Sequence, residues 1–192
     1  MNAISQMVTQ QFAGTAGEQI AARLGVSEGT ADMAVQVATP LILAALARNA
    51  SQPEQADALH RAVVSDHDGT ILDNITSYLG NPQAANGARI LEHVLGGQRS
   101  VVENNLAQAT GIEQSAAGNL MEIIAPLVLG AVGRKQQQHD FDSLALAQYL
   151  GEQQEKQATA PGMMGMLSSM LDLNQDGNTT DDLACLAGNC LK

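Results

Sequence analysis

An apolar segment with a proline in its interior occurs twice in this sequence, at residues 35–47 and again at residues 123–133. A proline inside a helix removes one backbone donor and clashes with the carbonyl group four residues earlier, which costs about 3 kcal/mol unless the helix bends. Pro40 and Pro126 therefore require the same unusual local packing twice. We expect both segments to form long, buried helices that bend just before their prolines.

The residues before the two proline segments also correspond to one another. Gly25-Val26 precedes the first segment, and Gly111-Ile112 stands at the equivalent place before the second. Chance does not easily place an interior proline in the same apolar setting twice, so we predict an internal duplication of one helical unit. The two copies are expected at about residues 16–80 and 102–151, and the first carries extra residues within 51–68.

The composition restricts the fold class to helices. Only two Phe, two Tyr and no Trp occur in 192 residues, so the core must be built from Ala, Leu, Ile, Val and Met. Small aliphatic side chains suit closely packed helices, whereas strands favour β-branched and aromatic residues. We predict an all-α fold, an irregular helical array at residues 1–151, followed by a linker at 152–162. A C-terminal appendage at 163–192 holds a Met-rich segment, an acidic loop and a last helix.

The charge of the chain argues against two classes of partner. Its net charge of −11 repels nucleic-acid backbones and anionic lipids. A helix-turn-helix-like pattern at residues 19–35 has no basic residue between Arg23 and Arg48, so we expect no nucleic-acid binding. The apolar run around Pro40 is short and Ala-rich, which favours a core helix over a membrane span. No basic region precedes the N-terminal apolar residues, and we predict a cytoplasmic protein.

An acidic stretch near the C-terminus follows the order of a calcium-binding loop. In such loops oxygen ligands come from the first, third, fifth and seventh residues, and a glycine at the sixth permits a sharp turn. The matching residues here are Asp172, Asn174, Asp176, Gly177 and Asn178. Leu183 replaces the closing glutamate, so Asp182 or Asp181 must supply the last carboxylate. We predict weak Ca²⁺ binding; the alternative is a polar turn that caps the last helix.

Several of these motifs together resemble a known family. They are the Ile-Leu-Glu-His-Val-Leu-Gly-Gly run at residues 90–97, Gly111-Ile112, the Ala-Pro-Leu-Val-Leu-Gly run at 125–130, and the acidic tail at 172–183. The chain resembles the YidB-like bacterial family (domain of unknown function 937) over most of its length. This resemblance implies an irregular all-helical array with an internal duplication. It implies no established activity and provides no catalytic residues.

Histidines beside carboxylates form the other candidate site. Asp66-His67-Asp68 and His139-Asp140 each precede a segment that contains Tyr-Leu-Gly, so the two groups could meet as a metal or acid–base site. Solvated loop charges are the simpler interpretation. His93 is expected in the last turn of a helix, where the helix dipole favours a cation.

The sequence therefore favours a non-enzymatic helical scaffold or protein-interaction module, with a protein partner or a second copy of itself bound to it. It contains no glycine-rich phosphate loop, nucleophile elbow or zinc-spaced Cys/His cluster. An active site assembled from distant residues is left open. The alternative hypothesis is a small-ligand-binding or hydrolytic protein with a cleft between the two repeats.

Overall fold

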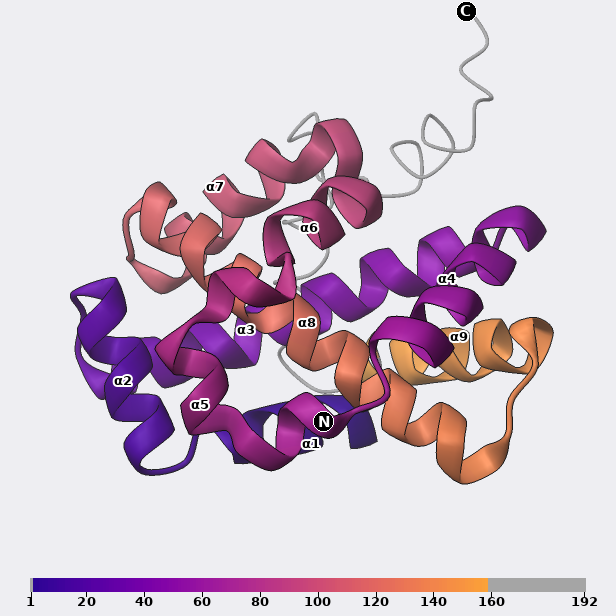
Figure 1. Cartoon of the computed structure of the whole chain (residues 1–192). Coiled ribbons are helices and arrows are strands. Elements are labelled where there is room, and N and C mark those ends of the chain that lie inside the picture. Colours follow the sequence, from indigo (N-terminus) through magenta and orange to yellow (C-terminus); the bar gives the residue numbers. More distant parts are fainter. Residues whose placement is uncertain (1, 159–192) are drawn as a thin grey trace, which may run out of the picture.

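The computed structural model describes residues 2–158, and every regular element in that range is helical. Nine α-helices are joined by short turns and 3-10 segments (Figure 1). They are α1 (Ala3–Gln11), α2 (Thr15–Leu24), α3 (Glu28–Ala50), α4 (Pro53–Asp66), α5 (Ile75–Gly80), α6 (Gly87–Leu95), α7 (Arg99–Thr110), α8 (Gln114–His139) and α9 (Ser143–Ala158). The 3-10 segments are η1 (Thr70–Asn74), η2 (Pro82–Ala85) and η3 (Gly96–Gln98). The predicted all-α fold is confirmed for this part of the chain.

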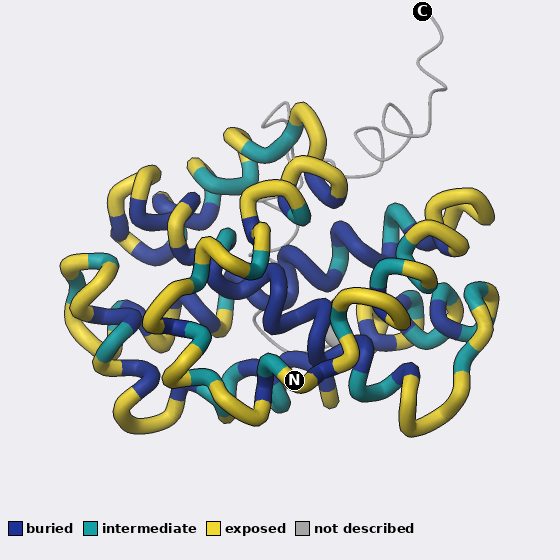
Figure 2. The backbone as a smooth tube through the Cα atoms, viewed as in Figure 1, coloured by how far each residue is buried: buried dark blue, intermediate teal, exposed yellow. Residues whose placement is uncertain are grey.

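Two long helices, α3 and α8, pack against each other at the centre of the molecule. Figure 2 shows both as mostly buried, with exposed residues concentrated on the surrounding helices. Ile42 and Leu43 of α3 are fully buried, as are Ile124 and Leu127 of α8. Helix α8 also contacts α1, α2, α4, α6 and α7. A helix enclosed in this way needs apolar residues on every face, which explains the continuous apolar runs in the sequence.

Both interior prolines lie inside these central helices, as predicted. Pro40 is buried within α3 and Pro126 is buried within α8. A bend of each helix before its proline stays a prediction. Burial of the apolar side chains around each proline compensates the backbone hydrogen bond that the ring removes.

Each central helix is entered through a glycine corner of the same kind. Gly25 ends α2 with a φ of 69°, and Gly111 ends α7 with a φ of 72°. These left-handed conformations are accessible to glycine without steric cost, which explains why glycine stands at both corners. The Ser27 hydroxyl then caps α3 by accepting a 3.2 Å hydrogen bond from the Thr30 backbone nitrogen. The pattern that resembled a helix-turn-helix is therefore the α2–α3 corner of the core.

Helices α3 and α8 are also long and apolar enough to cross a membrane, by length and composition alone. The apolar window of α3 is 67% buried inside the fold, and that of α8 is 89% buried. Membrane spans and core helices of soluble proteins both meet these criteria, and most of each apolar window is buried inside the fold.

The predicted linker at residues 152–162 is wrong over its first seven residues, because α9 continues through Gly151 to Ala158. Gln153 is only 4% exposed, and its carbonyl oxygen accepts a 3.0 Å hydrogen bond from the Asn2 side chain. This contact joins the beginning of the described chain to α9. The helical domain therefore extends past residue 151. Residues 159–162 and the appendage at 163–192 lie outside the described range.

Candidate binding groove

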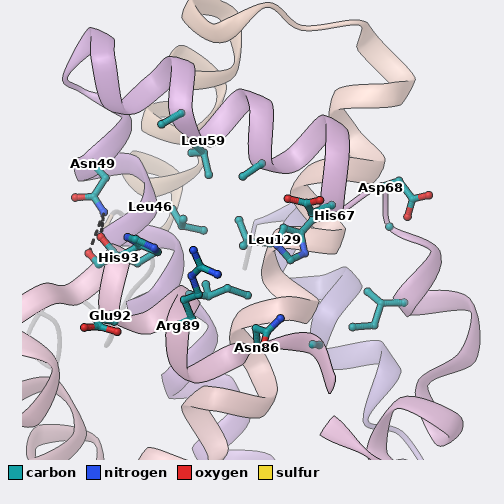
Figure 3. Close-up of a pocket in the computed structure, with 18 of the residues that line it drawn as sticks. Leu46, Asn49, Leu59, His67, Asp68, Asn86, Arg89, Glu92, His93 and Leu129 are labelled. Atoms are coloured by element: carbon teal, nitrogen blue, oxygen red, sulfur yellow. Dashed lines mark hydrogen bonds between the residues drawn. The ribbon is translucent and has the colours of Figure 1, made fainter. Parts of the chain in front are cut away.

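A groove of about 860 Å³ lies between α4 and α6, above the central helices. Its floor is apolar and is formed by Leu46 of α3, Leu59 of α4 and Leu129 of α8 (Figure 3). The loop between α4 and η1 also contributes to the lining. The seam between α3 and α8 is packed with buried aliphatic side chains, so the cleft expected between the two repeats does not lie there. Side chains of both central helices meet in the groove floor, Leu46 from α3 and Leu129 from α8.

The loop at the end of α4 is seated directly on α8. A β-carbon at Gly133 would lie 1.7 Å from the His67 carbonyl oxygen, so only a glycine permits this approach. Arg134 holds the same loop by donating to the Gly69 carbonyl oxygen at 2.8 Å and to the Asp73 carboxylate at 2.7 Å. These contacts fix the position of His67 at the edge of the groove.

The opposite wall is held against α8 in a similar way. A β-carbon at Gly87, the first residue of α6, would lie 1.8 Å from the Glu122 carbonyl oxygen. Arg99 of α7 forms ion pairs with Glu103 and with Glu122, so it joins α7 to α8 beside this contact. The Asn49 side chain of α3 donates to the Val94 carbonyl oxygen at 2.9 Å. Both groove walls therefore rest on the central helices.

Polar side chains converge above the apolar floor. In Figure 3, Arg89 and Asn86 of the α6 wall and His67 of the opposite wall point into the cavity, whereas Glu92 and Asp68 point away from it. Within residues 2–158, Arg89 forms no ion pair and no hydrogen bond. An unpaired guanidinium at the edge of a concave site with an apolar floor is typical of ligand-binding sites.

Burial favours the neutral form of the His67 imidazole. Burial lowers the pKa of His67, and the nearby carboxylates of Asp66 and Asp68 raise it by a smaller amount. The Asp68 carboxylate accepts hydrogen bonds from the Thr70 backbone nitrogen at 3.0 Å and from its hydroxyl at 2.7 Å, which lower the pKa of Asp68. The Thr70 hydroxyl therefore donates away from His67. Among the described residues, the groove lining contains the Thr70 hydroxyl but no Ser or Cys.

The histidine groups singled out in the sequence are only partly brought together. Asp66, His67 and Asp68 all line the groove, but His139 stacks on Phe141 with ring centroids 5.1 Å apart and is absent from the lining. Residues 2–158 contain no group of three His, Cys, Asp or Glu side chains suited to a metal ion. His93 lies in the last turn of α6, as predicted.

The predicted calcium ligands lie outside the described residues. They are Asp172, Asn174, Asp176, Asn178 and Asp182. Sequence reasoning missed Arg89 and Asn86, the two polar residues of the α6 wall that point into the groove. The sequence pattern that could have identified this wall is an arginine on the polar side of an amphipathic helix. That pattern is common on protein surfaces and does not by itself indicate a groove.

The described residues form an all-helical domain with a concave groove whose lining is both apolar and polar. The model of a family of bacterial proteins of unknown function (DUF937) matches residues 6–136, which is more than half of the chain. The chain belongs to this family, and the resemblance noted in the sequence is confirmed. Comparisons with curated proteins and with solved structures found no match.

Proposed function

We propose that this protein is a non-enzymatic helical scaffold that holds a ligand in the groove between α4 and α6. The observation that carries the proposal is the convergence of Arg89, Asn86 and His67 above an apolar floor. The volume of about 860 Å³ is within the range of small-molecule sites, roughly 300–1,000 Å³. A hydrolytic role has less support, because no Ser or Cys lines the groove and the Thr70 hydroxyl donates its hydrogen bond to Asp68 instead of His67.

The scaffold is proposed to have arisen by the internal duplication of residues 16–80 and 102–151. The support is that the corners at Gly25 and Gly111 have nearly equal φ angles and that each leads into a long helix with an interior proline. A duplicated pair of central helices makes a rigid support for the groove, because α3 and α8 bury each other.

Blocking the groove tests the proposal. Ala62→Trp places a large ring in the groove lining, whereas Val64→Trp enlarges a side chain on the same helix that is 50% exposed and does not line the groove. We expect the neutral dye N-phenyl-1-naphthylamine to fluoresce with the wild type and with Val64→Trp. The Ala62→Trp protein should bind it at least about tenfold more weakly. Equal binding by both variants with unchanged melting temperatures would disprove the proposed site.

We further propose that the acidic C-terminal loop binds Ca²⁺ weakly and orders the appendage of a cytoplasmic scaffold. The support is the spacing of oxygen-bearing side chains around Gly177. A protein partner or a second copy of the chain could then bind the ordered appendage.

Calcium is expected to raise the melting temperature of the wild type at millimolar concentration, because a ligand that binds only the folded form stabilises it. The Asp172→Ala/Asp176→Ala double variant should lose this increase. Asp32→Ala/Asp57→Ala removes the same charge from exposed helical sites and should keep it. Scanning calorimetry and native mass measurements, with magnesium as the comparison ion, check the result. A calcium response that the loop variant retains would rule out this loop as the site.

A further inference from the structure

We infer that the groove binds short apolar peptides with free ends, with Arg89 holding the terminal carboxylate and Asp66 the terminal ammonium group. This inference rests on the proposed function, because it assumes that the groove is the ligand site. Arg89 stands in the first turn of α6 and Asp66 in the last turn of α4, so the two charges come from opposite walls.

Of the charged side chains that line the groove, one positive and one negative side chain are placed to bind a ligand. Four ionised side chains line the groove: Asp66, Asp68, Arg89 and Glu92. Asp68 and Glu92 both point away from the cavity (Figure 3), and the Asp68 carboxylate accepts two hydrogen bonds from Thr70. Arg89 and Asp66 remain, and neither forms an ion pair within residues 2–158. A ligand that satisfies both must itself carry one charge of each sign.

Ligands of a single charge fit this arrangement less well. The net charge of −11 repels an anionic ligand at long range. A cationic ligand would cover Arg89 without pairing it, and burial of an unpaired charge is unfavourable. A zwitterion avoids both penalties, because its carboxylate pairs with the guanidinium while its ammonium group pairs with Asp66.

The surroundings of each charge support the same orientation. The Asn86 side chain points into the cavity beside Arg89, so an amide donor accompanies the planar guanidinium that binds carboxylates through two parallel hydrogen bonds. At the other wall, burial favours the neutral form of His67, whose unprotonated ring nitrogen can accept a hydrogen bond from an ammonium group.

The size and the apolar lining of the groove favour a peptide over a single amino acid. Leu46, Leu59 and Leu129 form a continuous apolar floor, and one amino acid would occupy a small part of 860 Å³. Two or three apolar side chains can cover this floor while the peptide termini reach the two walls.

Tri-leucine and its capped forms test the assignment by isothermal titration calorimetry. Tri-leucine should bind at least about tenfold more tightly than either N-acetyl-tri-leucine or tri-leucine amide. Arg89→Gln should abolish the preference for the free acid over the amide and leave the preference for the free amine. Asp66→Asn should do the reverse. Arg61→Gln and Asp57→Asn, on α4 but outside the groove lining, should leave both preferences intact.

The outcomes separate this inference from the proposed function. If free and capped peptides bind equally, and Ala62→Trp still blocks them, the groove binds ligands but the recognition of both ends is wrong. If only one cap weakens binding, the two-ended assignment is overturned. If neither the peptides nor N-phenyl-1-naphthylamine bind, the proposed function fails as well. Arg89 and Asp66 are exposed, so their variants should keep the wild-type melting temperature.

Discussion

Replacing Gly133 with alanine is expected to lower the free energy of unfolding by about 3 kcal/mol, near the upper end for overpacking. The new β-carbon would lie 1.7 Å from the His67 carbonyl oxygen and 2.9 Å from its carbonyl carbon. Both atoms belong to backbone, so neither can turn away as a flexible side chain would. The clash outweighs the roughly 1 kcal/mol by which alanine is the better helix former. Urea unfolding measures the loss, and the melting temperature should fall by about 6–12 °C.

Gly29→Ala is the matched control for this substitution. Gly29 lies in the first turn of α3, and a β-carbon there would meet no heavy atom within 4 Å. The same chemical change should therefore stabilise the protein by about 0.4–1 kcal/mol. If Gly133→Ala proves as stable as the wild type, the close contact between α8 and the His67 loop is not present in solution.

The sequence predicted the central helices well, because their signals are local. A long apolar run with an interior proline identifies α3 and α8 wherever their partners lie, and a glycine followed by a serine N-cap marks the start of α3. The end of α9 could not be found in this way. Its last turns include Gln153, whose contact with Asn2 forms only on folding, because the two residues are 151 positions apart in the chain.

The groove was harder to predict than the fold. His67 and its neighbouring carboxylates were recognised as polar loop residues, but their position depends on the contact of that loop with Gly133. From sequence alone, a glycine inside a helix indicates only a lower helix propensity. In this fold, Gly133 allows the backbone of the His67 loop to approach α8 closely. His139, which could have met His67 on the sequence evidence, instead stacks on Phe141 and does not line the groove. Arg89 carried no local signal for a site.

Leu127→Ala is expected to lower the free energy of unfolding by about 2–5 kcal/mol. Leu127 lies in the middle of α8 and has no exposed surface, and the surrounding helices cannot collapse fully into the space that it leaves. The loss combines the apolar transfer energy of the missing atoms with the cost of the cavity. Urea unfolding of the purified protein in detergent-free buffer measures it.

Leu144→Ala makes the same change at a side chain that is 66% exposed on α9, and should alter stability by no more than about 0.5 kcal/mol. A large difference between the two variants in water requires α8 to be packed inside a folded, soluble domain. A helix that crosses a membrane would present Leu127 to lipid or to another span, and its truncation would then not weaken a fold in water. Equal free energies of unfolding for Leu127→Ala and Leu144→Ala would therefore contradict the role of α8 as the core helix that supports both groove walls.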